Sequence, residues 1–314
     1  MDGQWLLLVN PLAGRGISAS CLKRVTDRID SHGITHRAVV TDSAEQLVDF
    51  ASMASSKGYD GIMVHGGDGT LSHAAAGLIH GRSSIPVTVI PHGSGNDWAR
   101  TVGIASLSDT VRAVMSGETV RMDAAECIIR DPSGSNVHSS ILVNSAGIGL
   151  DAHVLGRAIR LRKRYGLGKL AYISSLLGSV AALPCWEGIV AVDGEEVFSG
   201  EYLSLTCGIG PYVGGGMLLS PSSSPVDDLL DATLVRPVSR RNLLISLPMV
   251  YSGSLLEHPA VSSWRGGEII LQSKGSLEVE LDGEALSGLP AGSSMVIRSM
   301  PSAFLALRNP GANL

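Results

Sequence analysis

Apolar and polar positions follow two different periods over the first third of the chain. Residues 5–10 (WLLLVN) and 36–40 (HRAVV) are short, mostly apolar runs, whereas Cys21, Val25 and Ile29 recur at intervals of four between them. An interval of four places side chains on one face of a helix, and a short apolar run is typical of a buried strand. The pattern predicts a strand, a helix and a second strand in succession.

The same alternation continues beyond residue 40. Ser43 and Gln46 have the spacing of a capping box, so a second helix is predicted from Ser43 to near Gly58. GIMVH (61–65) and PVTVIP (86–91) follow as predicted strands, and each leads into a glycine-rich turn and a helix. Strands that alternate with helices form a parallel sheet, and ligands bind at the carboxyl ends of its strands.

The pattern changes after about Val120. Predicted strands there alternate around polar turns such as DPSGSN and LDGEAL, and one helical region from about Ala152 to Leu183 interrupts them. A chain of 314 residues exceeds the usual size of a single core, so two domains are expected. We predict an α/β domain with a parallel sheet over residues 1–120. Residues 121–314 are predicted to form a β-rich, mainly antiparallel domain, whose last strand is free to return to the first.

Composition narrows the function classes. Hydrophobic residues make up 44% and charged residues 17%, which excludes a disordered chain. The net charge of −5 gives no overall attraction to nucleic acid. The four cysteines are far apart in the sequence and form no CxxC pair, so their spacing indicates neither a zinc site nor a disulfide framework. The N-terminus lacks the basic region of a signal peptide, and we expect a cytoplasmic protein.

Three glycine-rich turns are expected at one edge of the first domain. They are NPLAGRG (10–16), GGDGT (66–70) and PHGSGND (91–97). Glycine allows backbone N–H groups to converge on an anion, and the following helix adds the positive end of its dipole. Three such turns on one edge favour a polyphosphate ligand over three ordinary left-handed turns.

Two common nucleotide motifs fit less well. No lysine follows the glycines, so the Walker A pattern is absent. A GxGxxA string occurs at residues 147–152, but a dinucleotide site needs an acidic residue about 20 positions further on. No Asp or Glu lies between Asp151 and Glu187, which disfavours a nicotinamide dinucleotide.

The order of five motifs resembles a known family. NPLAG, GGDGTLS, PHGSGNDWAR, NSAGIGLDA and a late LDGE occur in the order seen in the soluble diacylglycerol kinase catalytic family, which includes sphingosine kinases and bacterial lipid kinases. The resemblance spans nearly the whole chain. GGDGT alone is shared with NAD kinases, whereas its combination with a PxGxxND turn resembles the lipid kinase branch.

The resemblance implies a fold and a nucleotide site. The first domain would be similar to NAD kinase and phosphofructokinase, and the active site would lie between the two domains. The implied ATP-binding residues are Asn10, Pro11, Leu12, Ala13, Gly14, Thr41, Gly66, Gly67, Asp68, Gly69, Thr70, Leu71, Ser72, Ser94 and Asn96. Asp97 either completes the third turn or caps the helix that follows.

Asp68 is a candidate for two roles. A carboxylate beside phosphate-binding backbone can hold Mg²⁺, directly or through water, and phosphoryl transfer relies on such charge compensation. In sphingosine kinase relatives the matching aspartate is regarded as the base that accepts the substrate proton. The surrounding glycines leave room for phosphates and metal.

A second acidic candidate is ambiguous because the sequence DGE occurs twice, at residues 193–195 and 282–284. Asp-Gly is a common pair in hairpin turns, so either copy is compatible with a purely structural turn. Resemblance to bacterial diacylglycerol kinases favours the later copy. It implies Glu284 as the general base and Asp282 as a partner in an aspartate, water and magnesium network.

The resemblance also implies a structural Mg²⁺ site. Asp227 matches a metal-binding position of some relatives, with backbone oxygens from Ser224 and Leu229. Asp228 stands where the family usually has glycine. Its extra charge favours ion binding, but the loss of glycine removes backbone freedom from the turn.

The region 156–169 carries six basic residues and no acidic one. Such a run is either a solvated helix face or a contact with an anionic membrane surface, worth ~1 kcal/mol per basic residue near the bilayer. The uncharged stretch 170–183 follows it and is too short to span a membrane.

Together these patterns predict a peripherally membrane-associated, ATP- and Mg²⁺-dependent lipid kinase of phospholipid metabolism. The expected acceptor is the primary hydroxyl of diacylglycerol, or of a sphingoid base or another lipid alcohol. A NAD kinase and a non-catalytic nucleotide or lipid sensor are the alternatives. The sequence leaves the oligomeric state open, including a homodimer.

Overall fold

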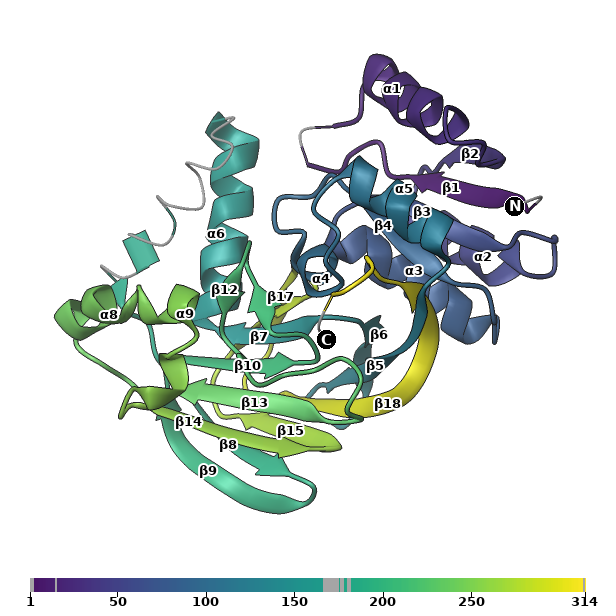
Figure 1. The fold of residues 1–314 in the computed structure, drawn as a ribbon. Coiled ribbons are helices and arrows are strands. Elements are labelled where there is room, and N and C mark those ends of the chain that lie inside the picture. The colour runs from purple at the N-terminus through teal and green to yellow at the C-terminus, as the bar shows by residue number, and fades with distance from the viewer. Residues whose placement is uncertain (1–2, 15, 166–174, 176–177, 180–181, 313) are drawn as a thin grey trace. The chain divides into compact units, whose positions relative to one another are not determined.

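A computed structural model describes residues 3–14, 16–165, 175, 178–179, 182–312 and 314 (Figure 1). The chain divides into two compact units. Unit 1 comprises Met1–Ala124 and Pro301–Leu314, and unit 2 comprises Ala125–Met300. The sequence pattern placed the change near residue 120, and the structure places it four residues later.

Unit 1 alternates strands and helices. Its elements are β1 (Trp5–Val9), α1 (Ala19–Asp30), β2 (His36–Val40), α2 (Ala44–Ala54), β3 (Gly61–Gly66), α3 (Asp68–His80), β4 (Val87–Pro91), α4 (Asp97–Thr101) and α5 (Leu107–Ser116). The strands pair in parallel in the order β2-β1-β3-β4. Every residue of β1 and β3 is buried, as expected for a parallel sheet that is covered on both faces.

Serine residues begin three of these helices. Ser18, Ser43 and Ser106 each accept a hydrogen bond from a backbone N–H three residues further on. The predicted second helix does begin after Ser43, although it ends at Ala54 rather than near Gly58.

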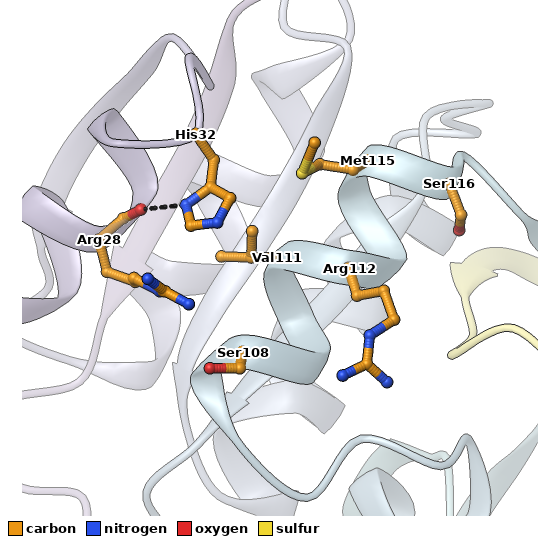
Figure 2. Close-up of a pocket in the computed structure, with 7 residues that line it drawn as sticks. All are labelled: Arg28, His32, Ser108, Val111, Arg112, Met115 and Ser116. Carbon is orange, nitrogen blue, oxygen red and sulfur yellow. Dashed lines mark hydrogen bonds between the residues drawn. The ribbon is translucent and has the colours of Figure 1, made fainter.

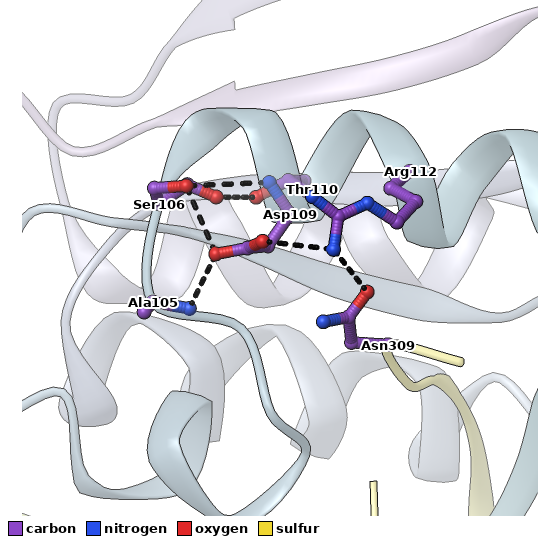
Figure 3. Close-up of polar contacts among 6 residues, drawn as sticks. All are labelled: Ala105, Ser106, Asp109, Thr110, Arg112 and Asn309. Carbon is purple, nitrogen blue, oxygen red and sulfur yellow. Dashed lines mark hydrogen bonds and ion pairs between the residues drawn. The ribbon is translucent and has the colours of Figure 1, made fainter. Parts of the chain in front are cut away.

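The cap of α5 is larger (Figure 3). Asp109 accepts from the backbone N–H of Ala105 at 3.1 Å and from the Ser106 hydroxyl at 2.9 Å. Arg112 lies 3.4 Å from the other oxygen of Asp109 and donates to Asn309, so the cluster ties α5 to the C-terminal segment of unit 1.

Unit 2 is antiparallel. Its elements are β6 (Asn136–Leu142), β7 (Ser145–Gly149), α6 (Leu150–Tyr165), β8 (Trp186–Val192), β9 (Glu195–Tyr202), β10 (Ser204–Gly208), β11 (Tyr212–Val213), β12 (Met217–Leu218), β13 (Leu230–Val235), α8 (Arg240–Ser246), α9 (Met249–Ser252), the 3₁₀ helix η1 (Leu255–Glu257), β14 (Val261–Gly266), β15 (Glu268–Ser273), β16 (Leu277–Leu281) and β17 (Glu284–Leu289). Six of its strands form one sheet in the order β14-β13-β10-β7-β16-β17.

Two long strands belong to both units. β5 (Thr119–Arg130) begins in unit 1 and pairs with β6 in unit 2. β18 (Ser294–Leu307) pairs antiparallel with β15 in unit 2, and its last residues pair in parallel with β4. The final strand therefore joins the parallel sheet of unit 1 at Ala306.

The helical region predicted from Ala152 to Leu183 begins as α6, while most of residues 166–181 lie outside the described residues. The core of unit 2 consists of apolar side chains from strands of two sheets, including Leu205, Leu271 and Val279, all fully buried. Among the described residues, no helix is both long and apolar enough to span a bilayer.

Candidate functional site

The three glycine-rich turns of unit 1 follow three neighbouring parallel strands. Val9 pairs with His65 and Gly66 pairs with Pro91, so β1, β3 and β4 end at the same edge. The backbone N–H of His92 donates to the carbonyl of Gly66 at 2.8 Å. The sheet thus brings residues 10–14, 66–70 and 91–97 together.

The first turn is closed by Asn10. Its Oδ1 accepts from the backbone N–H of Leu12 at 3.0 Å, and its Nδ2 donates to Thr70 Oγ1 at 3.0 Å. Gly14 has φ of +59°, and a Cβ built on it would lie 2.3 Å from the carbonyl oxygen of His92. Only glycine fits there, which explains its place in the motif.

The second and third turns touch through their backbones. A Cβ built on Gly67 would lie 2.8 Å from Gly93 Cα, and one built on Gly93 would lie 2.5 Å from Gly67 Cα. Asn96 closes the third turn, because its side chain accepts from the Gly93 N–H at 2.8 Å and donates to the Gly93 carbonyl at 3.1 Å. The result is a continuous surface of main chain with little side chain on it.

Asp68 is the first residue of α3 and is half-buried. Its Oδ1 accepts from the backbone N–H of Trp98 at 2.9 Å. Burial raises the pKa of Asp68, while backbone N–H groups at the start of α4 act in the opposite direction. The carboxylate therefore connects the second turn to the helix that follows the third.

Asp97 joins Asp68 beside Gly95. A Cβ built on Gly95 would lie 2.7 Å from Asp97 Oδ2 and 3.0 Å from Asp68 Oδ2, so two carboxylate oxygens flank a space that only glycine leaves open. Asp97 is buried, and the residue that precedes α4 is Asn96, with φ of +55°. Two hard oxygen donors beside exposed main chain fit a Mg²⁺ ion that carries phosphates.

Other residues of the predicted nucleotide site differ in accessibility. Thr41 is buried and donates to the Val9 carbonyl at 3.2 Å, and Leu71 is only 1% exposed, in the core. Leu12, at 83%, and Ser94 are exposed. Thr41 and Leu71 are therefore supports of the turns, whereas Leu12 and Ser94 are free to meet a ligand.

Unit 2 carries both DGE sequences on tight hairpin turns. Asp193 and Gly194 have φ of +50° and +83°, and Asp282 and Gly283 have +46° and +85°. Positive φ at both central positions is the type I′ geometry. Backbone shape does not separate the two copies.

The aspartates of the two DGE copies differ in the number of backbone N–H groups from which they accept hydrogen bonds. Asp193 accepts one backbone N–H, that of Glu268, at 2.9 Å. Asp282 is 4% exposed, and its two oxygens accept from the N–H groups of three successive residues, Val143, Asn144 and Ser145, at 2.8–3.0 Å. Asp282 therefore fixes the β16–β17 turn to the chain just before β7, and with it the position of Glu284.

Glu284 and Glu195 are both exposed at the start of a strand. Glu284 lies close enough to His138 for its charge to raise the pKa of that imidazole, against a larger lowering by burial. Exposure alone leaves both glutamates available to a substrate.

The predicted structural metal site has another cation in it. Asp227 accepts from the Leu229 N–H at 3.1 Å through Oδ1, and its Oδ2 is paired with the guanidinium of Arg265. Arg265 Nε also lies 3.1 Å from Asp231. Asp228 has φ of +68°, the conformation that the usual glycine would adopt freely. A guanidinium already neutralises the Asp227 carboxylate, which weakens its attraction for Mg²⁺; the metal site of Asp227, Ser224 and Leu229 stays a prediction.

A pocket of about 440 Å³ lies on unit 1 between α1 and α5 (Figure 2). Arg28 of α1 and His32, just beyond the end of α1, line it on one side, and Val111, Arg112 and Met115 line it from α5. None of its lining residues belongs to the glycine-rich turns, so it is separate from the candidate nucleotide site.

Two models of known protein families match the chain, one in its first part and one in its second. The diacylglycerol kinase catalytic domain matches residues 4–127, and the YegS C-terminal NAD kinase beta sandwich-like domain matches residues 144–307. A diacylglycerol kinase of Mycobacterium tuberculosis is 30% identical over 308 residues, covering 98% of this chain and 95% of the relative. The "Probable lipid kinase YegS-like" protein of Pseudomonas aeruginosa is 27% identical and covers 78% of this chain and 76% of that protein.

Solved structures show the same fold. A diacylglycerol kinase from Bacillus anthracis aligns with a TM-score of 0.72 at 19% identity, over 99% of this chain and 98% of that chain. Yeast NADH kinase in complex with NADH aligns with a TM-score of 0.55 at 12% identity, over 99% and 85%. The chain belongs to the diacylglycerol kinase family of lipid kinases, and it is a kinase.

Proposed function

We propose that the protein transfers the γ-phosphate of ATP, with Mg²⁺, to the primary hydroxyl of a lipid alcohol, with diacylglycerol as the first candidate. The main support is the contact of Gly67 with Gly93 beside the carboxylates of Asp68 and Asp97. The relative from Mycobacterium tuberculosis, which is named a diacylglycerol kinase, supports the choice of acceptor.

The nucleotide half of the mechanism is carried by main chain. Backbone N–H groups of the second and third turns donate to phosphate oxygens, and the amino end of α3 adds a favourable dipole. Bound Mg²⁺ supplies positive charge to the phosphates, and Asp68 and Asp97 would hold it, directly or through water. Asn10 and Thr70 keep the first turn against the second.

The acceptor half requires a base for the hydroxyl proton. We assign this role to Glu284, which is exposed at the start of β17. Asp282 is a positioning residue in this proposal, because its carboxylate accepts three backbone N–H groups and holds the turn that carries Glu284.

Membrane contact is the second part of the proposal. On α6, Arg160 is exposed and Arg157 is partly exposed. On α8, Arg240 and Arg241 are exposed, and Leu244 and Ile245 are 46% and 64% exposed. A basic and apolar surface of this kind suits an anionic bilayer, in which a diacylglycerol substrate resides.

Packing in unit 2 supports treating these two helices as one surface. Leu243 of α8 packs against the cluster of Leu150, Val154 and Leu203, and Leu150 and Val154 belong to α6. The next two residues of α8, Leu244 and Ile245, point outward instead. No acidic residue occurs in the sequence from Arg236 to Leu256.

One experiment tests the reaction. The purified protein is incubated with labelled ATP in three separate reactions, which contain diacylglycerol, a sphingoid base or NAD⁺ as the acceptor. The labelled products are then separated by chromatography. We expect labelled phosphatidic acid only when Mg²⁺ is present. Label in NADP⁺, or ATP hydrolysis without a labelled lipid, would overturn the proposal, and label in the sphingoid base alone would change the acceptor.

A further inference from the structure

The folded chain brings one cysteine and two histidines together in unit 1. Cys21 lies in α1, His65 is near the end of β3, and His92 follows β4. One ligand atom from each side chain lies within 4.8 Å of the other two. Cys21 and His65 are 44 positions apart in the chain, and His65 and His92 are 27 apart, so no short sequence motif indicates the cluster.

His65 is the central member. It is 1% exposed, and among the described residues its buried Nδ1 has no hydrogen-bond partner. Its ring meets that of His92 at a centroid distance of 5.0 Å and an angle of 75°. A buried polar atom without a partner is uncommon in folded proteins, and an absent ion is one of its ordinary explanations.

We infer that Cys21, His65 and His92 form a site for a transition-metal ion, with Zn²⁺ as the physiological candidate. One thiolate and two imidazoles are donors that Zn²⁺ prefers over the oxygen-seeking Mg²⁺. Three protein ligands leave a fourth, tetrahedral position for water. The site is therefore distinct in chemistry from the Mg²⁺ that accompanies ATP.

The geometry requires a modest closure. A tetrahedral Zn²⁺ with bonds of about 2.3 Å to sulfur and about 2.0–2.1 Å to nitrogen places its ligand atoms roughly 3.3–3.6 Å apart. The atoms here must approach by up to roughly 1.2–1.5 Å, given their separation of up to 4.8 Å. Cys21 and His92 are partly exposed and are the side chains that have room to rotate, while buried His65 stays in place.

The protonation state of His65 favours the same ligand set. Burial, together with the neighbouring His92, lowers the pKa of His65 to about 4, so its imidazole is neutral at physiological pH and keeps a lone pair for metal. Cys21 releases its thiol proton to solvent when the sulfur binds.

The bound ion would link α1 to the ends of two strands. His65 immediately precedes Gly66, and His92 precedes Gly93, which are the first glycines of the second and third turns. Gly14 of the first turn also lies against His92. The expected consequence is a stabilised edge of the sheet, because the three ligands are together only in the folded chain.

Direct binding tests the inference without reference to kinase activity, so a failure here leaves the proposed function standing. Metal-free protein, without nucleotide, is titrated with Zn²⁺ against a chromophoric chelator and with Co²⁺ as a spectroscopic probe. We expect one equivalent per chain, a thiolate-to-cobalt charge-transfer band and a raised melting temperature.

Variants locate the site. Cys21→Ser should abolish the charge-transfer band, and Cys21→Ser and His92→Asn should each weaken Zn²⁺ binding by more than about 10-fold, since each removes a coordinate bond. Cys185→Ser changes an exposed cysteine and His32→Asn a histidine that is partly exposed, as His92 is, and both variants should bind like the wild type. Both test variants alter partly exposed residues, and circular dichroism verifies that they fold. Binding that survives in either of them, or no binding in the wild type, overturns the site.

Discussion

Asp68 and Trp98 are joined by a 2.9 Å hydrogen bond from the backbone N–H of Trp98 to Oδ1 of the carboxylate. This bond connects the start of α3 to the start of α4, and burial at the same place raises the pKa of Asp68. The ionised carboxylate is therefore less favourable in the folded chain than in the unfolded chain. A carboxyl group placed where its ionised form is disfavoured is more consistent with a function than with stability.

The first prediction follows from this raised pKa. The stability linked to protonated Asp68 is fully present below the pKa of the unfolded carboxyl and is lost as the pH rises through the folded pKa. Asp68→Asn, which keeps an oxygen for the Trp98 N–H, should therefore be at least as stable as the wild type at pH 7. The difference should disappear in acid, as measured by urea denaturation across pH. A clear loss of stability at pH 7 would contradict this account.

The kinase activity of the Asp68→Asn variant should fall, although its stability should not. Asp68→Asn removes a ligand or base of the proposed reaction, so turnover should fall by roughly 10²-fold or more. Asp49→Asn, which alters an exposed carboxylate of the same unit, is the matched control and should be silent. Near wild-type turnover in Asp68→Asn would remove Asp68 from the mechanism.

Local sequence patterns were enough to predict the strands, glycine-rich turns and helices of unit 1. A strand followed by glycines and then a helix is encoded within about ten residues, and serine caps mark three helix starts. Local patterns could not predict that Asp282 accepts backbone hydrogen bonds from Val143 and Ser145, because these residues lie 139 and 137 positions away. The cluster of Cys21, His65 and His92 likewise depends on how three elements pack.

The pairing of Asp227 with Arg265 shows a different limit. The resemblance pointed to a metal at Asp227, but Arg265 is 38 positions away, on β14. Nothing local in the segment 220–234 indicates which cation it meets. Only strand pairing, in which Asp231 lies opposite Arg265, brings the guanidinium to both carboxylates.

Arg265→Gln should destabilise unit 2 by about 1–3 kcal/mol, because it leaves the buried carboxylate of Asp231 and that of Asp227 without their cation. Arg298→Gln removes a partner of Glu268 and serves as the control, with a change below ~1 kcal/mol expected for a partly exposed pair. Added Mg²⁺ should leave the melting temperature of the wild type unchanged if Arg265 takes the place of the metal. A rise in that temperature that Asp227→Asn abolishes would restore the metal site.

Asp282→Ala should be more damaging to stability than Asp193→Ala. The buried Asp282 carboxylate accepts three backbone N–H groups, and their loss should lower the free energy of unfolding by about 2–4 kcal/mol. Asp193 accepts one, and its loss should amount to less than about 1.5 kcal/mol. Denaturant titrations of both variants measure the contrast, and equal losses would refute the positioning role of Asp282.

Replacing Leu244 and Ile245 with serine, or Arg240 and Arg241 with glutamine, should weaken binding to anionic vesicles by about 10-fold or more. Only the arginine effect should shrink at high salt, because apolar contacts are not screened. Activity on detergent-dispersed lipid should be preserved. Val137→Ser alters a comparably exposed apolar residue of unit 2, at 49%, and should have no effect. Vesicle binding unchanged in both double variants would exclude this surface from membrane contact.

The two DGE turns provide the sharpest test of the acceptor site, because their backbones match and only the surroundings differ. Glu284→Gln should lower kcat by about 10²- to 10⁴-fold with little change in ATP affinity, since a base acts on the acceptor hydroxyl and unit 1 carries the glycine turns. Glu195→Gln is the control on the equivalent turn and should be nearly silent. Turnover at saturating lipid and ATP, with fluorescence titration of ATP, separates the two effects. A crippled Glu195 variant beside a healthy Glu284 variant would reverse the assignment, and full activity in both would leave Asp68 as the base.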